Sequence, residues 1–171
     1  GAAMQDAAFM SDLKRVSDRG LSVDLVGSPE LLTPARHLAT AFPDLRLVID
    51  HLAGVRIDGG QPPADWLDGM SELAKCAKVS CKISGLAEGT GQRGGKAPGA
   101  VEFYRPILDA MWERFGPDRL IYGSNWPVCE HFATLATVQS IASDYFRQKG
   151  QAAWAKVFAQ NATAAYFSSA S

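Results

Sequence analysis

Two residues with chemically useful side chains stand at the ends of predicted strands, His51 after a run of aliphatic residues and Asn125 after a shorter one. The strand period of two places Leu47, Ile49 and His51 on one face, so His51 caps that face if the aliphatic residues fill the interior of the sheet. The same period aligns Asn125 with Ile121. An imidazole can transfer a proton or bind a metal, and a carboxamide can orient a water molecule or a carbonyl. The spacing therefore predicts that His51 and Asn125 converge at one end of the sheet.

The elements that must position these side chains are short apolar strands, each followed by a longer stretch of helical period. We expect strands over residues 21–26, 45–52, 79–86 and 119–123, and helices over 5–19, 30–41, 64–77, 101–115, 134–149 and 151–167. Parallel strands joined by helices form either an open doubly wound sheet or part of a (β/α)8 barrel. Both folds bind ligands beyond the carboxyl ends of the strands. The candidate ligand-binding residues at these ends are Asp24, His51, Ser84, Gly85 and the stretch 123–126.

Residues 89–94 match the GxGxxG pattern of dinucleotide-binding loops, and Asp109 lies where a ribose-binding acid is sought. That fingerprint has to open directly into a helix, whereas further glycines and a proline delay the next helix here. A nucleotide-binding function would rest on this match alone. We interpret residues 88–99, which contain five glycines, as a flexible loop.

The three cysteines, Cys76, Cys81 and Cys129, are an odd number, which argues against a disulfide scaffold and suits a reducing compartment. Cys76 and Cys81 have no second pair to complete a tetrahedral metal site, so we expect both to be buried as small apolar residues. The first residues have no basic region followed by an apolar one, as a signal peptide would. These features predict a cytoplasmic protein.

The composition indicates one globular domain over residues 1–171, since 47% of the residues are hydrophobic and 20% are charged. The formal net charge of -1 gives no long-range positive field, so we exclude nucleic acid and anionic membranes as partners. No apolar run is long enough to span a bilayer.

Four stretches resemble a known family in their order and spacing: LVIDHLAG at 47–54, CKISGLAE at 81–88, FGPDRLIYGSNWPVC at 115–129 and VFAQNATAAYF at 157–167. The family is the amidohydrolase-related (amidohydrolase 2) group of metal-dependent TIM-barrel hydrolases, which includes fuconolactonase-like and 2-pyrone-4,6-dicarboxylate lactonase-like enzymes. The resemblance covers essentially the whole chain. It implies an α/β fold of (β/α)8 TIM-barrel type, of which this chain supplies the last four βα units as a C-terminal half.

In this resemblance His51 is the strand-six histidine, and Asn125 occupies the strand-eight position that usually holds Asp. The implied reaction is hydrolysis of a lactone or related cyclic ester of a sugar acid or carboxylic acid, with water attacking the carbonyl. His51 would polarise the carbonyl or bind a divalent metal such as zinc, and Asn125 would position water or substrate. An amide cannot accept a proton near neutral pH, so another base, such as His51, would be needed.

The remaining contacts to a small-molecule substrate are expected from Lys82, Ser84, Trp126, Asp24 and His131. Lys82, Ser84 and Trp126 would shape the pocket and engage a carboxylate or ring oxygens, and His131 would contact the substrate from the rim. Lys82 can do so only if it points inward, because Lys82 and its neighbour Cys81 lie on opposite faces of a strand. A catalytic zinc normally needs three protein ligands, of which His51 is one.

The family's His-x-His motif and its first four strands have no counterpart in these residues. Four parallel strands alone leave two exposed edges and an open interior. We therefore expect closure by homo-oligomerisation or by a missing N-terminal half. The alternative from another class is a catalytically inactive half-barrel that acts as a binding or assembly module.

Overall fold

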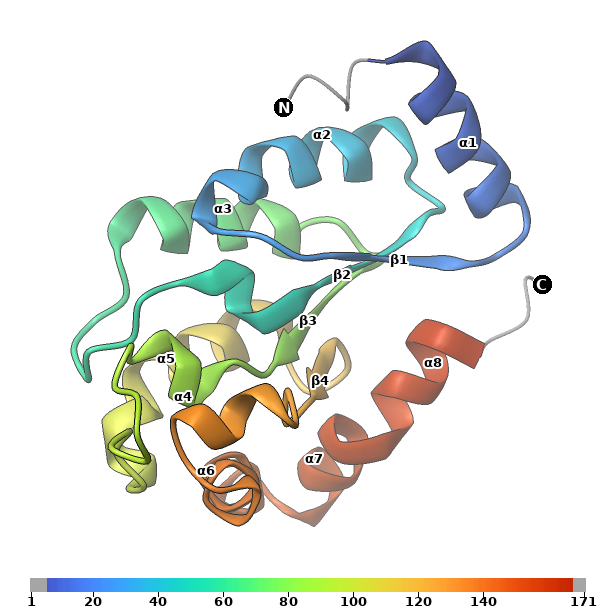
Figure 1. Ribbon diagram of the computed structural model, residues 1–171. Helices are drawn as coiled ribbons and strands as arrows, with labels where there is room; N and C mark the ends of the chain where they lie inside the picture. The colour runs from blue at the N-terminus through green and yellow to red at the C-terminus, as the bar shows by residue number, and fades with distance from the viewer. Residues whose placement is uncertain (1–5, 168–171) are drawn as a thin grey trace.

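The computed structural model describes residues 6–167 and contains a four-stranded parallel sheet with helices between its strands (Figure 1). The strands are β1 (Ser22–Leu25), β2 (Arg46–Ile49), β3 (Val79–Ile83) and β4 (Leu120–Tyr122), hydrogen-bonded in the order β1-β2-β3-β4. A doubly wound nucleotide-binding sheet reverses its strand order part-way, whereas a barrel adds each strand beside the previous one. The observed order is therefore that of a partial (β/α) barrel.

Helices connect the successive strands of the sheet. One further helix precedes the first strand, and the remaining helices follow β3 or β4. Their bounds are α1 (Ala7–Asp18), α2 (Leu32–Ala41), α3 (Ala64–Ala74), α4 (Leu86–Gly89), α5 (Val101–Phe115), α6 (Leu135–Gln148), α7 (Gln151–Ala155) and α8 (Asn161–Phe167). Short turns η2 (Pro29–Leu31), η3 (Asp50–Gly54), η4 (Val128–His131) and η5 (Lys156–Gln160) join them. The first predicted helix begins at residue 7, and Gln5 lies outside the described residues.

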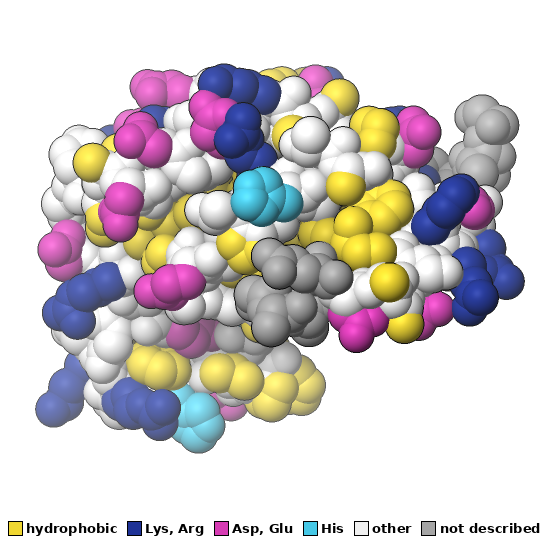
Figure 2. All heavy atoms as spheres, turned by 90° about the horizontal axis from the view of Figure 1, so that it is seen from above, with side chains coloured by type: hydrophobic (Ala, Val, Ile, Leu, Met, Phe, Trp, Pro, Cys, Tyr) yellow, Lys and Arg dark blue, Asp and Glu magenta, His cyan; other side chains and the backbone are white. Residues whose placement is uncertain are grey.

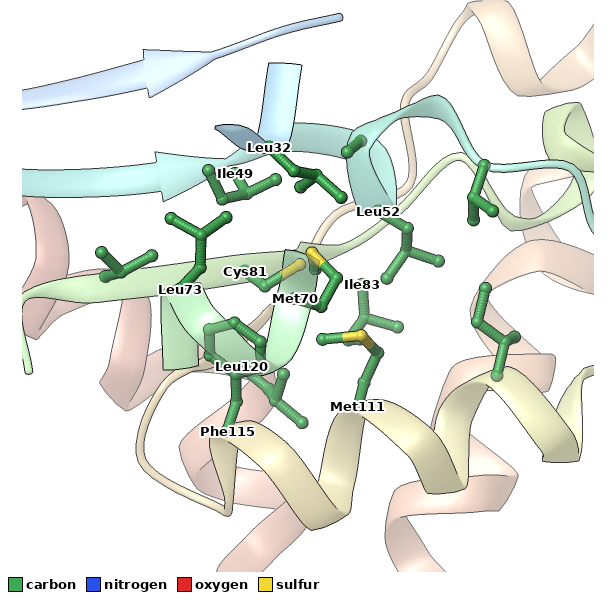
Figure 3. Close-up of a cluster of buried hydrophobic side chains, with 14 of the residues drawn as sticks. Leu32, Ile49, Leu52, Met70, Leu73, Cys81, Ile83, Met111, Phe115 and Leu120 are labelled. Atoms are coloured by element: carbon green, nitrogen blue, oxygen red, sulfur yellow. The ribbon is translucent and has the colours of Figure 1, made fainter. Parts of the chain in front are cut away.

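One face of the sheet packs against α2, α3 and α5 to form the main hydrophobic core (Figure 3). Leu47 and Ile49 of β2 and Cys81 and Ile83 of β3 point into this core and are fully buried. Leu73 and Met70 of α3 and Met111 and Phe115 of α5 meet them from the helices. Burial of side chains of this size stabilises the fold by about 1.5–3 kcal/mol each.

The opposite face of the sheet is concave in a barrel and carries the alternate residues. Val48 of β2 and Ile121 of β4 are buried there against Ala165 of α8, with Ala162 and Tyr166 packed beside them. Leu47 and Ile49 therefore do not line the concave face, and the condition under which they would carry His51 at the end of that face is not met, because the register turns them toward the helices. It is Val48 and its neighbours on the other face that point inward.

The strands end earlier than predicted, and this changes how the site is built. β2 ends at Ile49 rather than at residue 52, and β3 ends at Ile83 rather than at residue 86. His51 consequently lies in the turn η3 and not on a strand, so the period of two does not set its direction. The residues after β3 instead form a one-residue left-handed turn at Gly85 and then the short helix α4.

The glycine-rich segment 88–99 is anchored by hydrogen bonds to the residues at the end of η4. Its backbone donates hydrogen bonds from Gly94 N to His131 O at 2.8 Å and from Ala97 N to Phe132 O at 3.1 Å. The guanidinium of Arg93 lies 5.2 Å from the centre of the Phe132 ring. The segment does not open directly into a helix, since α5 begins only at residue 101. The dinucleotide fingerprint therefore lacks its structural context.

The cysteines are free thiols, of which Cys81 and Cys129 are buried and Cys76 is only partly buried. On the face seen in Figure 2, basic and acidic side chains are interspersed rather than gathered by sign. Within residues 6–167 no helix has the length and apolar character required to cross a membrane.

Candidate functional site

A buried serine, Ser84, forms a hydrogen bond with the imidazole of His51. Its Nδ1 lies 2.7 Å from Oγ of Ser84, which follows β3 and is 1% exposed. A serine hydroxyl can donate or accept, so the pair fixes the ring and leaves Nε2 with the complementary role. If Nδ1–H donates to Ser84, Nε2 is an acceptor and a base. Nε2 has no protein partner within the described residues.

The turn that carries His51 has an unusual backbone conformation. His51, Leu52 and Ala53 all have φ between 51° and 55°, in the left-handed region that costs an L-residue roughly 1–2 kcal/mol. Tertiary contacts hold it: the indole nitrogen of the buried Trp66 donates to Leu52 O at 2.9 Å. Such strain persists only where the surrounding structure over-determines it, and it clusters at functional sites. The turn places His51 at hydrogen-bond distance from Ser84, which follows β3.

Gly85 allows the segment after β3 to pass directly under His51. A Cβ atom at this position would lie 2.9 Å from Cβ of His51, and the φ of Gly85 is +68°. Gly123, which follows β4, is close to the same place, because a Cβ atom there would lie 3.3 Å from Cβ of Ser84. The ends of β2, β3 and β4 therefore meet around Ser84.

Asn125 also follows β4, and it forms a pair that sequence reasoning missed. Its Nδ2 donates to Oε1 of Glu88 in α4 at 2.8 Å, and its φ of 56° is in the left-handed region that asparagine tolerates. Oε2 of Glu88 is buried and has no hydrogen-bond partner among residues 6–167. Glu88 belongs to the stretch CKISGLAE, four residues after Ser84, and this spacing is the signal that could have found it.

Lys82 points to the concave face, as one of the two alternatives for β3 predicted. Its Nζ lies 2.5 Å from Asp24 and 2.8 Å from Asp50, which is 7% exposed. The hydroxyl of Tyr166 in α8 donates to Asp24 at 2.8 Å. Burial opposes the charged amine, but hydrogen bonds to the two carboxylates outweigh it and raise the pKa of Lys82. Asp50 and Tyr166 were not predicted as part of this cluster, and Asp50 stands directly before His51.

Trp126 and His131 lie further out on the surface. Trp126 is 61% exposed after Asn125, at a cis bond to Pro127, and His131 is exposed at the end of η4. The structure therefore pairs His51 with Ser84 and Lys82 with Asp24. It pairs Asn125 with Glu88 rather than with His51, and within residues 6–167 the side chains of Trp126 and His131 form no hydrogen bond or ion pair with the other predicted residues.

A cavity of about 630 Å³ lies at the opposite end of the sheet. Asp44, Lys78 and Asp118, which line it, stand just ahead of β2, β3 and β4. In barrels the amino end of the strands contributes to stability, and the chemistry occurs at the carboxyl end. Neither His51 nor Asn125 lines this cavity, so we place the candidate site at the carboxyl end of the strands.

The described residues do not fit a complete metal site. No group of three His, Cys, Asp or Glu side chains within residues 6–167 could hold a metal ion. Nε2 of His51 is a single ligand, and Asn125 turns its amide nitrogen toward Glu88. A catalytic zinc takes three protein ligands, so the other ligands would have to come from outside the described residues.

Comparison with known proteins identifies the family. The family model described as amidohydrolase matches residues 5–167. The chain belongs to the amidohydrolase family. Among curated proteins, an L-fucono-1,5-lactonase of Burkholderia ambifaria is 36% identical over 149 residues, which are 83% of this chain and 48% of that protein. This amidohydrolase chain thus spans about half the length of that relative.

Solved structures confirm the barrel fold. A crystal structure of an amidohydrolase from Burkholderia multivorans with bound HEPES superimposes with a TM-score of 0.88 at 25% identity, over 96% of this chain and 59% of that one. A second crystal form of that protein contains zinc and gives a TM-score of 0.82. A probable 2-pyrone-4,6-dicarboxylic acid hydrolase from Acinetobacter baumannii, 21% identical, matches 95% of this chain and 58% of that one with a TM-score of 0.75 and supports the fold alone. The four strands are therefore part of a TIM-type barrel.

Proposed function

We propose that this amidohydrolase-family chain provides the hydrolytic half of a site that opens a lactone, or a related cyclic ester, of a sugar acid or carboxylic acid. The observation that carries the proposal is the hydrogen bond between His51 Nδ1 and Ser84 Oγ at the carboxyl end of the sheet. The resemblance to an L-fucono-1,5-lactonase supports the substrate class.

In the proposed reaction, Nδ1–H of His51 donates to Ser84 and Nε2 accepts a proton from the attacking water. The water oxygen forms a bond to the carbonyl carbon, the ring carbon–oxygen bond breaks, and the ring oxygen takes from Nε2 of His51 the proton that the water lost and leaves as a hydroxyl group. The product is a hydroxy acid. Ser84 is too buried to attack the substrate itself, and its role is to hold the imidazole in this tautomer.

Asn125 would accept a hydrogen bond from the same water through Oδ1, since its Nδ2 is already bonded to Glu88. It orients the water but does not take its proton. Nε2 of His51 could also join a zinc ion completed by ligands from elsewhere, and it cannot be base and metal ligand at once. We propose the role of base because it needs no further ligand.

Lys82 and Asp24 have a smaller part in this proposal than the sequence suggested. The ammonium of Lys82 is neutralised by two carboxylates, so a substrate carboxylate would have to displace Asp24 or Asp50 to reach it. Trp126 is exposed beside Asn125 and offers an indole face to a sugar or aromatic ring. His131 is proposed only as a contact at the rim.

The test is hydrolysis of a panel of sugar-acid lactones and pyrone carboxylates at neutral pH by the purified chain. We expect His51→Ala to abolish any hydrolysis that exceeds the uncatalysed rate. His37→Ala, an exposed histidine on α2, is the matched control and should hydrolyse as the parent does. Lactone hydrolysis that is unchanged in His51→Ala would remove His51 from the reaction. Absence of hydrolysis across the panel by a self-associated chain, in which the barrel is closed, would refute the function.

Closure of the barrel remains a separate proposal. β1 and β4 are the edges of the sheet, and the described residues provide no further strand for either. We propose that a second copy of the chain or a preceding half of the barrel completes it. Light scattering distinguishes these options, because self-association gives a multiple of 18.3 kDa and a requirement for another half leaves the chain at 18.3 kDa.

A further inference from the structure

Glu88 does not contact the substrate in the proposed reaction, yet within residues 6–167 it is the one side chain that hydrogen-bonds to the Asn125 amide. Oε1 of Glu88 accepts from Nδ2 of Asn125 at 2.8 Å. Oε2 is buried and has no hydrogen-bond partner within residues 6–167. Burial is the larger cause of the raised pKa of Tyr104 and of Cys129. The charge of the nearby Glu88 carboxylate raises the pKa of both groups further. It therefore lies between the amide and the interior of the protein.

A carboxylate can only accept hydrogen bonds, whereas an amide has one donor end and one acceptor end. Next to Glu88, the amide of Asn125 has only one favourable direction, with its nitrogen inward and its oxygen outward. The opposite direction would place Oδ1 against Oε1, with two acceptors in contact. The left-handed backbone at Asn125 and the short helix α4 set the two side chains at this distance.

We infer that Glu88 is a positioning residue, which fixes Asn125 with its amide oxygen toward the site and so makes position 125 a hydrogen-bond acceptor for water. This inference rests on the proposed function for the use of that acceptor, but the pairing itself does not. The pair also explains why an amide suits position 125 in this chain. An aspartate there would face Glu88 as a second carboxylate.

The pairing is tested by isosteric exchange and urea unfolding. In Asn125→Asp, two carboxyl groups lie at hydrogen-bond distance, so one retains a proton and its pKa rises. With a raised carboxyl pKa, the folded state holds a proton that the unfolded chain loses, so the folded state becomes less stable as the pH rises. The urea midpoint of this variant should therefore fall as the pH rises from about 4 to 7. In Asn125→Asp/Glu88→Gln an amide again faces a carboxylate, and this fall should disappear. Equal pH dependence in the single and double variants would overturn the pairing.

The direction of the amide is tested by kinetics on the lactone that gives the highest rate. In Glu88→Gln either end of the new amide can face Asn125, so the outward acceptor is no longer fixed, and we expect kcat to fall about tenfold with a smaller change in KM. The double variant should recover most of this loss, because the amide introduced at position 88 can donate to a carboxylate whose other oxygen faces outward. Glu130→Gln, an exposed glutamate in η4, is the matched control and should retain parental kcat.

A parental kcat in Glu88→Gln would overturn the positioning role, and so would a double variant that is no better than the single one. If no lactone is hydrolysed by a parent protein that self-associates and so closes the barrel, the proposed function fails. The unfolding series still decides whether Glu88 and Asn125 are paired, because it needs no substrate.

Discussion

The close approach of Gly85 to His51 predicts that a larger residue at position 85 destabilises the protein. Alanine at position 85 would have to adopt φ near +68° and would place its Cβ 2.9 Å from Cβ of His51. The left-handed backbone costs alanine about 1–2 kcal/mol. The crowding adds about 1–3 kcal/mol, because His51 is on a turn that is itself constrained. We therefore expect Gly85→Ala to lower the free energy of unfolding by about 2–5 kcal/mol.

Gly91→Ala is a control matched in backbone conformation. Gly91 also has φ of +68°, but nothing lies within 4 Å of a Cβ atom built there. Its expected cost is therefore the backbone contribution alone, about 1–2 kcal/mol. Urea unfolding of both variants at one pH and temperature gives two free energies, and their difference isolates the contact with His51.

The same pair of variants separates stability from activity. Gly85→Ala has to move His51 or α4, so lactone hydrolysis should fall even at temperatures where the variant is fully folded. Gly91→Ala should hydrolyse as the parent does. If the two variants lose the same free energy within about 0.5 kcal/mol, the precision expected for independent sites, His51 does not pack over Gly85 and the geometry of the turn is wrong.

Three further predictions concern buried polar groups. Trp66→Phe removes the donor to Leu52 O, which retains only a long bond of 3.4 Å from a backbone amide, so urea unfolding should show a loss of about 2 kcal/mol. Lys82→Met leaves Asp50, 7% exposed, without its cation and should cost about 3–5 kcal/mol at pH 7. Burial and the charge of a nearby glutamate raise the pKa of Tyr104 to about 12, so the folded state keeps a proton that the unfolded chain loses. The free energy of unfolding should therefore fall as the pH rises from 10 to 12, and Tyr104→Phe should reduce that slope.

Matched substitutions show what would contradict these three predictions. Trp112 is partly buried, and its indole nitrogen has no partner within the described residues, so Trp112→Phe should cost less than Trp66→Phe. Lys14 forms an exposed ion pair with Asp18, and Lys14→Met should change stability by less than about 0.5 kcal/mol. If Trp66→Phe and Trp112→Phe, or Lys82→Met and Lys14→Met, lose the same free energy of unfolding, burial does not make these polar groups important for stability. An unchanged alkaline slope in Tyr104→Phe would likewise show that Tyr104 does not cause the fall in stability.

The order of strands and helices could be predicted because it depends on local patterns. Apolar runs of five to eight residues alternate with helical periods, and the structure confirms four parallel strands in chain order. The face of each strand could not be predicted in the same way. Leu47 and Val48 are both aliphatic and both buried, so hydrophobicity alone does not tell which of them faces the helices.

The direction of His51 could not be predicted either, because it is set by contacts between distant parts of the chain. A period of two applies only while the backbone is extended, and η3 leaves that conformation at His51. The left-handed turn is compatible with this sequence because Trp66 donates to Leu52, and because Gly54 fits against Gly27, where a Cβ atom would lie 2.8 Å from Gly27 O. None of these partners is adjacent to His51 in the sequence.

The candidate site is built from two pairs that share one supporting segment. Ser84 holds Nδ1 of His51, and Glu88, four residues later, holds Nδ2 of Asn125. In each pair one polar atom of the functional residue is bonded to the protein, which leaves Nε2 and Oδ1 to act on a ligand. The segment 84–88 is thus the common support of two residues that come from the ends of β2 and β4. Hydrogen bonds from the following loop to residues 131 and 132 restrain that segment, so the glycine-rich stretch contributes to the site by holding its support rather than by contacting a nucleotide.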